Sequence, residues 1–156
     1  MKKKEWITLV IFILIIEAID YLSSMLSGDI SAAYNLLIKP PFSPLGIVFG
    51  IVWPILYALL GAAGYLIYRE NSEESSSQVF MWYLIQLLLN FSWSIIFFRF
   101  QAYWAALLVL ILMDIITAYI IFKSRKINKY ASLLMIPYLI WILYATYLNL
   151  GFALLK

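Results

Sequence analysis

Long apolar runs separated by short polar breaks are the dominant pattern along the chain. The runs cover residues 6–26, 46–68, 79–99, 104–123 and 131–153. Each holds at least about 20 residues, the length at which a helix rising about 1.5 Å per residue crosses a hydrocarbon core about 30 Å thick. The pattern therefore predicts an all-α integral membrane protein, a bundle of five transmembrane helices.

The breaks between these runs carry charges and turn-forming residues. The segment ENSEESSSQ at 70–78 is a polar loop that is too short to link separate domains. Residues 1–156 are therefore expected to form a single membrane domain. The lysines at 2–4 resemble the start of a signal peptide, but Glu17 and Asp20 follow the apolar stretch and no small-x-small cleavage site is evident. We expect the first helix to be retained.

The connection at 27–45, SGDISAAYNLLIKPPFSPL, is the longest in the chain. Its three prolines, Pro40, Pro41 and Pro44, fix φ and lack a backbone N–H, so the loop is expected to be ordered without being helical. Its apolar side chains favour packing onto the helices. We expect this loop to be a lid over the bundle, and the alternative is a loop that lies on the lipid headgroups.

Lysine and arginine are distributed unevenly between the two sides of the predicted bundle. Eight fall on the side of the N-terminus: Lys2, Lys3, Lys4, Arg69, Lys123, Arg125, Lys126 and Lys129. Three fall on the other side: Lys39, Arg99 and Lys156. Because segments rich in Lys and Arg stay in the cytoplasm, the N-terminus is expected inside the cell and the lid loop and C-terminus outside. The expected location is a bacterial cell membrane.

Composition limits the chemistry that the chain can carry out. It is 65% hydrophobic and 18% aromatic, and it contains no cysteine and no histidine. The missing thiolates exclude iron–sulfur clusters and thiol nucleophiles. The missing imidazoles exclude the usual acid–base relays, the usual zinc sites and histidine-ligated haem. We therefore expect no metal site, no required cofactor, no nucleic-acid partner and no conventional enzyme activity.

Several polar and aromatic residues lie deep inside the predicted spans. Those close to the middle of their helices are Glu17, Asn90, Asp114 and Trp141. A charged carboxylate at that depth costs about 2.5–3.5 kcal/mol, so these groups are expected to face the bundle interior, a partner or water. A further set falls in the outer half of the spans: Asp20, Trp53, Trp93, Tyr144 and Asn149.

Helical spacing places these residues on common faces. The stripes are Glu17, Asp20, Tyr21 and Ser24; Trp53, Tyr57, Gly61 and Gly64; Gln86, Asn90, Trp93 and Phe97; and Pro137, Trp141, Tyr144 and Leu148. Aromatic stripes with one or two amides suit a flat, largely apolar ligand. For any single residue the alternative is an amide that joins helices or a ring that fills space. The shared depth of the whole set favours a pocket.

Three stretches resemble one known family. They are KPPFSPLGIVFGIVWPILYALLGAAGYL at 39–66, LLLNFSWSIIFF at 87–98 and PYLIWILYATYLNL at 137–150. Together they resemble the TspO/translocator protein family, also called tryptophan-rich sensory proteins or peripheral-type benzodiazepine receptors. The similarity runs over nearly the whole chain, and it is the combination of the three motifs that is specific.

The resemblance implies a five-helix membrane receptor, often dimeric, that binds porphyrins such as protoporphyrin IX and benzodiazepine-site ligands. The family's pocket positions would correspond here to Tyr34, Pro44, Trp53, Tyr57, Asn90, Trp93, Trp141 and Ala145. The depth argument adds Tyr144. Trp53 and Trp141 match the tryptophans that are implicated in light-dependent porphyrin breakdown by some bacterial members.

The chain also departs from the family pattern. Its loop lacks the tryptophan of the common P-x-W-x-P-P motif, and Leu108 stands where the fourth helix commonly carries an aspartate, the acid appearing later at Asp114. Tyr147 and Lys156 are too far apart for the family's sterol motif. These departures put sterol binding in doubt and can alter ligand preference.

The expected function is a porphyrin-binding membrane sensor or translocator. The macrocycle would stack between Trp53 and Trp141, Asn90 would supply an orienting hydrogen bond, and Lys39 would meet a propionate. One alternative is light-dependent porphyrin degradation by the two tryptophans.

A second alternative is a small proton-coupled transporter that uses Glu17, Asp20 and Asp114. The absence of an internal repeat and of paired interrupted helices argues against it.

Overall fold

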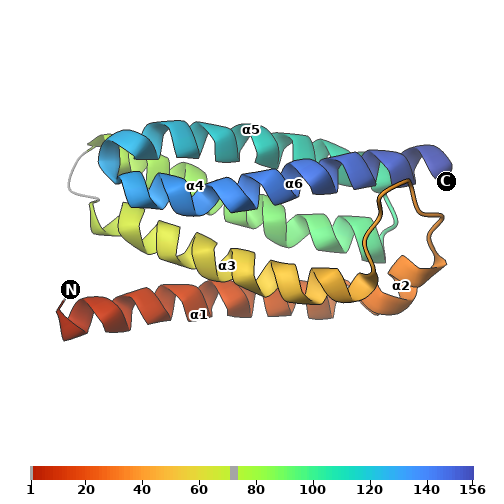
Figure 1. The fold of residues 1–156 in the computed structure, drawn as a ribbon, viewed down its shortest axis with the longest axis horizontal. Helices are drawn as coiled ribbons and strands as arrows, with labels where there is room; N and C mark the ends of the chain where they lie inside the picture. The colour runs from red at the N-terminus through yellow and green to blue at the C-terminus, as the bar shows by residue number, and fades with distance from the viewer. Residues whose placement is uncertain (1, 71–73) are drawn as a thin grey trace.

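The computed structural model describes residues 2–70 and 74–156. Its elements are α1 (Lys3–Leu26), α2 (Ile30–Leu36), α3 (Gly46–Arg69), α4 (Glu74–Ser94), the π-helix η1 (Ile95–Arg99), α5 (Tyr103–Ile127) and α6 (Lys129–Leu155) (Figure 1). Within the described ranges there is no strand, and five helices, counting α4 with η1, are long and apolar enough to cross a membrane. The predicted fold class is confirmed.

The predicted start of the third helix, residue 79, needs correction. The polar loop was expected to extend to residue 78, but α4 already begins at Glu74. A transmembrane helix is not obliged to end at the membrane surface, because its polar first turn can be hydrated while the backbone hydrogen bonds continue. The part of the predicted loop at 71–73 lies outside the described residues.

The prediction of a non-helical lid loop is correct for residues 27–29 and 37–45 but not for the stretch between them. That stretch, Ile30–Leu36, forms α2, whose N-cap Asp29 accepts a hydrogen bond from the backbone N–H of Ala32 at 2.9 Å. No proline interrupts the turns of α2, and the first proline, Pro40, comes after its end. A good N-cap followed by proline-free sequence is enough for a short helix.

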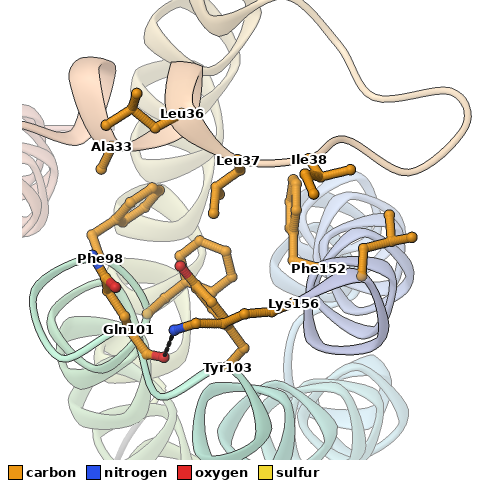
Figure 2. Close-up of a pocket in the computed structure, with 11 residues that line it drawn as sticks. Ala33, Leu36, Leu37, Ile38, Phe98, Gln101, Tyr103, Phe152 and Lys156 are labelled. Carbon is orange, nitrogen blue, oxygen red and sulfur yellow. Dashed lines mark hydrogen bonds between the residues drawn. The ribbon is translucent and has the colours of Figure 1, made fainter.

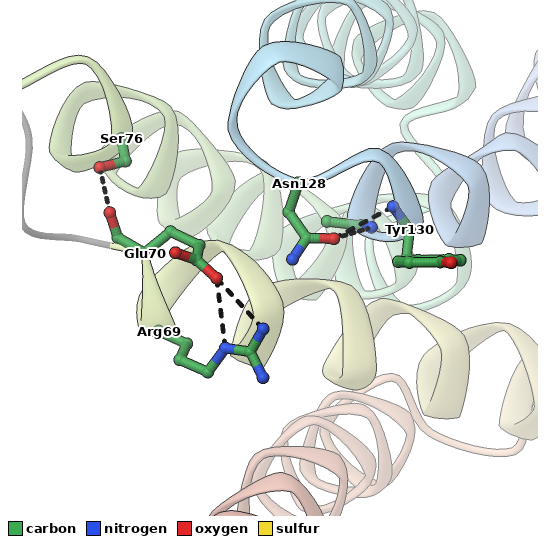
Figure 3. A network of polar contacts seen from close by, with 6 residues as sticks. Arg69, Glu70, Ser76, Asn128 and Tyr130 are labelled. Carbon is green, nitrogen blue, oxygen red and sulfur yellow. Dashed lines mark hydrogen bonds and ion pairs between the residues drawn. The ribbon is translucent and has the colours of Figure 1, made fainter. Parts of the chain in front are cut away.

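The long helices run side by side, and the two termini lie at opposite ends of the bundle (Figure 1). The end that carries α2 and the last turns of α6 is called the lid end below. At the other end, polar side chains close the helix termini (Figure 3). Asn128 accepts a bond from the backbone N–H of Tyr130 at 3.0 Å. Arg69 pairs with Glu70 at 3.1 Å, and the Glu70 carbonyl accepts a bond from the Ser76 hydroxyl at 2.7 Å.

Helix α1 changes its neighbour along its length. In its first half it packs against α3, where Gly61 leaves room for the backbone of Ile13. In its second half it is bonded to α4, because the Ser23 hydroxyl donates to the carbonyl of Phe91 at 2.7 Å. At the lid end, the second half of α1 and the first half of α3 line a cavity, which is the candidate site.

Candidate ligand-binding site

A cavity of about 350 Å³ lies at the lid end between α1, α3, α4 and α6, with α2 along its edge. Its lining residues are Asp20, Ser24, Ile30, Ser31, Tyr34, Gly46, Phe49, Gly50, Trp53, Pro54, Tyr57, Asn90, Trp93, Ser94, Phe97, Phe98, Ala145, Leu148, Asn149 and Phe152. The volume is at the lower end of the range of about 300–1,000 Å³ that is usual for ligand pockets. Six of the nine predicted site residues line it: Tyr34, Trp53, Tyr57, Asn90, Trp93 and Ala145.

Helix α3 supplies both an aromatic wall and an open face to the cavity. Trp53 and Tyr57 are one turn apart, and their rings stack with centroids 5.3 Å apart and planes at 17°. Gly46, Gly50 and Pro54 also lie one turn apart and line the cavity without large side chains. The wall is therefore flat beside a space that a ligand ring can enter.

The two buried amides of α4, Gln86 and Asn90, are bonded to tyrosines. The Tyr57 hydroxyl donates to Asn90 Oδ1 at 2.8 Å, and Asn90 Nδ2 donates to the Tyr138 hydroxyl at 2.6 Å. Gln86 Nε2 also donates to the Tyr138 hydroxyl. Because buried polar groups away from water need partners, this chain of bonds holds the amide of Asn90 in one orientation. A ligand would have to compete with Tyr57 for the Asn90 oxygen or use its remaining lone pair.

Trp93 is held by a bond that sequence reasoning did not anticipate. Its Nε1 donates to Asn149 Oδ1 at 3.1 Å, and Asn149 Nδ2 donates to the carbonyl of Tyr103 at 2.8 Å. Asn149 was predicted to lie at the depth of the pocket, and it lines the cavity. It fixes the indole plane of Trp93 beside the ring of Trp53, with centroids 6.3 Å apart.

Trp141 lies behind the cavity wall and does not line the cavity. Its ring meets Trp53 edge-to-face, with centroids 6.2 Å apart and planes at 88°. The two rings touch, so the expected macrocycle has no space between them in this structure. Of the predicted stripe on α6, Leu148 is buried and lines the cavity, but Pro137 is exposed. The inward face also includes Tyr138, Ile142 and Ala145, each one residue after a predicted position.

Tyr144 and Pro44 hold the lid loop in place and do not line the cavity. The Tyr144 hydroxyl donates to the carbonyl of Phe42 at 2.6 Å. The Tyr34 hydroxyl donates to the carbonyl of Pro44 at 2.7 Å. A third bond, from the Tyr147 hydroxyl to the carbonyl of Pro41 at 2.8 Å, was not predicted. The loop is therefore bonded to the end of the bundle, but none of residues 37–45 lines this cavity, and only α2 of the predicted lid does.

The ring of Tyr34 closes the lid end of the cavity against Phe49, with centroids 5.1 Å apart. Burial raises the pKa of the Tyr34 phenol, the nearby Tyr144 raises it further, and a hydrogen bond with Ser43 opposes the shift. The hydroxyl is therefore protonated at neutral pH, as its bond to the carbonyl of Pro44 requires.

Comparison with known proteins identifies the family of this chain. The model of the TspO/MBR family matches residues 9–155. This chain belongs to the TspO/MBR family. It is 38% identical over 149 residues to the tryptophan-rich protein TspO of Archaeoglobus fulgidus, covering 95% of this chain and 96% of that protein. It is 32% identical over 148 residues to the protein of the same name from Chlorobaculum tepidum, with 94% of each chain covered. The translocator protein of Ovis aries is 30% identical over 147 residues, 92% of this chain and 87% of that one.

In this TspO/MBR family chain, the π-helix η1 places two consecutive aromatic rings inside the bundle. The backbone N–H of Phe100 bonds the carbonyl of Ile95 at 3.1 Å, an i to i+5 bond that marks the wider turn. Both Phe97 and Phe98 consequently contact Trp93, with centroids 5.4 and 6.2 Å away. A stripe drawn at the α-helical period predicts Phe97 but not Phe98.

These rings separate the cavity of about 350 Å³, called the main cavity below, from a second cavity of about 320 Å³ at the same end of the bundle. Phe97, Phe98 and Phe152 line both cavities. Figure 2 shows the second cavity, in which the Lys156 side chain reaches toward Gln101. Lys156 Nζ donates to the Gln101 carbonyl at 3.3 Å and lies 4.5 Å from the ring centroid of Tyr103.

The three predicted intramembrane carboxylates of this TspO/MBR family chain do not share a site. Asp20 lines the main cavity, and Glu17 does not. Asp114 accepts a hydrogen bond from the Thr146 hydroxyl at 2.7 Å, away from the cavity lining. Among the residues that the structure describes, no group of three His, Cys, Asp or Glu side chains could hold a metal ion. Tyr21, on the predicted stripe of α1, is exposed on the outer surface of the bundle.

Proposed function

We propose that this TspO/MBR family protein is a membrane receptor or translocator that binds porphyrins and benzodiazepine-site-type ligands in the main cavity. The observation that carries the proposal is the cavity wall, in which Trp53, Tyr57 and Trp93 present ring surfaces beside a hollow. Flat, largely apolar ligands gain most from such surfaces, and a few fixed polar groups give them an orientation.

The size of the cavity limits how a porphyrin can bind. A volume of about 350 Å³ is small for a tetrapyrrole, so the ligand must displace part of the wall or the lid. Two sets of contacts can give way to make this space. One is the partition between the two cavities, formed by the rings of Phe97, Phe98 and Phe152. The other is the three tyrosine hydrogen bonds to the lid loop. Opening the partition would join the two cavities.

A dark titration of the purified protein with protoporphyrin IX tests the proposal. Quenching of tryptophan fluorescence is expected to saturate in the wild type, and the affinity is expected to fall about tenfold or more in Trp93→Ala, since stacking contacts of this size contribute about 1–3 kcal/mol. Trp104→Ala is the matched control, because Trp104 is exposed and does not line the cavity. Quenching without saturation, or equal loss in both variants, would refute the proposal.

The same titration with haem tests the mode of binding. The chain has no histidine, so metal-free porphyrin is expected to bind at least as tightly as haem. A strong preference for haem, accompanied by axial-ligand bands in the absorption spectrum, would contradict this.

A second candidate is light-dependent porphyrin breakdown. It is supported by the contact between Trp53, which lines the cavity, and Trp141 behind it at 6.2 Å, because an indole pair in contact can share a radical. Illumination of the complex is expected to bleach the porphyrin bands in the wild type and not in Trp141→Phe. Dark binding is expected to persist in that variant, and its loss would instead assign a binding role to Trp141.

Orientation and assembly belong to the same proposal. The N-terminus would be cytoplasmic, the lid loop and C-terminus external, in a bacterial cell membrane, and the protein a homodimer. The chain has no cysteine, so single cysteines can report the orientation. In intact cells a membrane-impermeant maleimide is expected to label Phe42→Cys in the exposed lid loop and not Lys126→Cys. Chemical cross-linking in membranes tests the dimer.

A further inference from the structure

We propose that the main cavity selects flat aromatic ligands that carry a positively charged nitrogen, and that Asp20 binds this nitrogen. The inference rests on the proposed function only in that it places a ligand in the same cavity. It goes further by naming the ligand group and the residue that recognises it.

The charge of the cavity comes from one side chain. Among the described lining residues, Asp20 is the only Asp, Glu, Lys or Arg, and the others are apolar, aromatic or neutral polar residues. A carboxylate at this depth in a membrane is costly unless it has a partner. The partner is therefore to be sought among basic residues of the chain or in the ligand.

The basic residues nearest to the lid end have other partners. Arg99 donates to the carbonyl of Leu26 at 3.1 Å, and Lys156 occupies the second cavity. Lys39 lies 4.9 Å from the ring centroid of Tyr34 and does not line the main cavity. None of these three cations faces Asp20 across the main cavity. A cationic ligand supplies the missing charge.

The neighbours of Asp20 leave its oxygens open to a ligand. The hydroxyl of Tyr57 lies near Asp20, but its single proton is donated to Asn90 Oδ1 at 2.8 Å. Glu17, one turn earlier on α1, adds negative charge beside Asp20. This stretch of α1 therefore attracts a cation and offers it a carboxylate acceptor.

The aromatic wall favours the same class of ligand. Trp53 and Trp93 line the cavity together with Asp20, and the faces of indole rings attract cations. A flat cation can therefore stack on an indole while its N–H group donates to the carboxylate. A carboxylate group on the ligand would be repelled by Asp20 and would have to point away from it, toward Lys39 at the lid.

Binding of the cation proflavine, compared with that of the neutral acridine, tests the inference. The two molecules share the same three-ring frame and differ in charge at neutral pH. Titrations are carried out in the dark, on the full chain in uncharged detergent, with tryptophan quenching as the readout. Proflavine is expected to bind about 10-fold to 100-fold more tightly, which is the effect of a hydrogen bond to a charged partner.

Three variants identify the residue that is responsible. In Asp20→Asn the preference for proflavine is expected to fall to less than about threefold, and in Asp20→Glu it is expected to persist. Glu17→Gln is the matched control, because it removes a carboxylate from the same helix that does not line the cavity. It is expected to keep most of the preference. Thermal unfolding of each variant shows that the fold is intact, and Asp20→Glu tests the charge even if Asp20→Asn does not fold.

The outcomes separate this inference from the proposed function. Equal binding of acridine and proflavine, or a preference that survives in Asp20→Asn, overturns the role of Asp20 even if protoporphyrin IX binds. A preference that depends on Asp20, together with no saturable binding of protoporphyrin IX, supports the inference and refutes porphyrin binding. A preference lost equally in Glu17→Gln shows a general effect of charge and overturns the assignment to Asp20.

Discussion

Helix α3 is packed tightly along one half and faces a cavity along the other. Near the end opposite the lid, a Cβ at Gly61 would lie 2.7 Å from the Ile13 Cα, so the glycine lets α1 approach closely. At Gly64, the ring of Tyr83 on α4 occupies the space that a Cβ would need. At the lid end, a Cβ at Gly50 would have no atom within 4 Å, and one at Gly46 would meet Tyr34 at 3.7 Å. Small residues at a similar spacing thus serve close packing in one half and leave space in the other.

This difference shows that a small-residue pattern alone does not define a helix interface. Whether a glycine of α3 serves close packing depends on which helix lies beside it. Helix α1 lies against α3 at Gly61, but at Ser23 it is bonded to α4. The glycines at the lid end consequently face a hollow. The following substitutions test whether the two halves differ in this way.

The largest effect is expected from Gly61→Ala. The added methyl overlaps backbone atoms of Ile13, which cannot rotate away, so α1 must shift. Overpacking of this kind costs about 1–3 kcal/mol of unfolding free energy. Denaturation in detergent followed by circular dichroism measures it. Unchanged stability would show that α1 is not fixed against α3.

The next effect is expected from Tyr138→Phe, at the boundary between the two halves. It removes the hydroxyl that accepts bonds from Asn90 and Gln86, leaving two buried donors without this partner. The loss of stability is expected to be about 1–2 kcal/mol, since bonds between helices in membranes are weaker than burial alone suggests. Tyr130→Phe is a suitable control in the same unfolding assay, because Tyr130 is exposed on the same helix. An equal effect of both variants would contradict the role of the network.

A smaller effect of opposite sign is expected from Gly50→Ala. The methyl has open space in the structure, and alanine is favoured over glycine within a helix by about 0.5–1 kcal/mol, so the protein should become slightly more stable. The methyl also enters the cavity, so the affinity for a flat ligand should fall. The unfolding free energies of Gly50→Ala and Gly61→Ala should therefore change in opposite directions, because Gly61→Ala should lower stability. Loss of stability in Gly50→Ala would mean that the hollow is filled.

The smallest effect is expected from Tyr144→Phe. It removes one hydrogen bond to the lid loop at a partly exposed position, with a cost of about 0.5 kcal/mol or less in unfolding free energy. The effect should instead appear in the lid, as faster amide hydrogen exchange of residues 42–46 and faster ligand association. Unchanged exchange would show that the Tyr34 and Tyr147 bonds suffice to hold the loop.

The sequence predicted the helices well because lipid makes the pattern strict. A span needs about 20 apolar residues, and polar groups within it need partners, so Tyr57, Asn90 and Trp93 were assigned to the interior correctly. The predicted stripe on α1 was correct for Asp20 and Ser24, which line the cavity, but not for Tyr21, which is exposed.

The sequence predicted the fine geometry less well. On α6 the inward face includes Tyr138 and not Pro137, because one residue changes the direction by about 100° and the packing of neighbouring helices decides between them. Phe98 was missed because the π-turn of η1 breaks the helical period. Helix α2 was not predicted because the effect of the three prolines was extended to the whole connection, although they all follow α2.

The way in which the lid is fastened has a consequence for variation. Tyr34, Tyr144 and Tyr147 all donate to main-chain oxygens of the segment 41–44. Such oxygens are supplied by every amino acid, so the fastening does not depend on which side chains the segment carries. Substitutions of the outward side chains of this segment can therefore change the outer surface of the lid end while the three bonds are preserved.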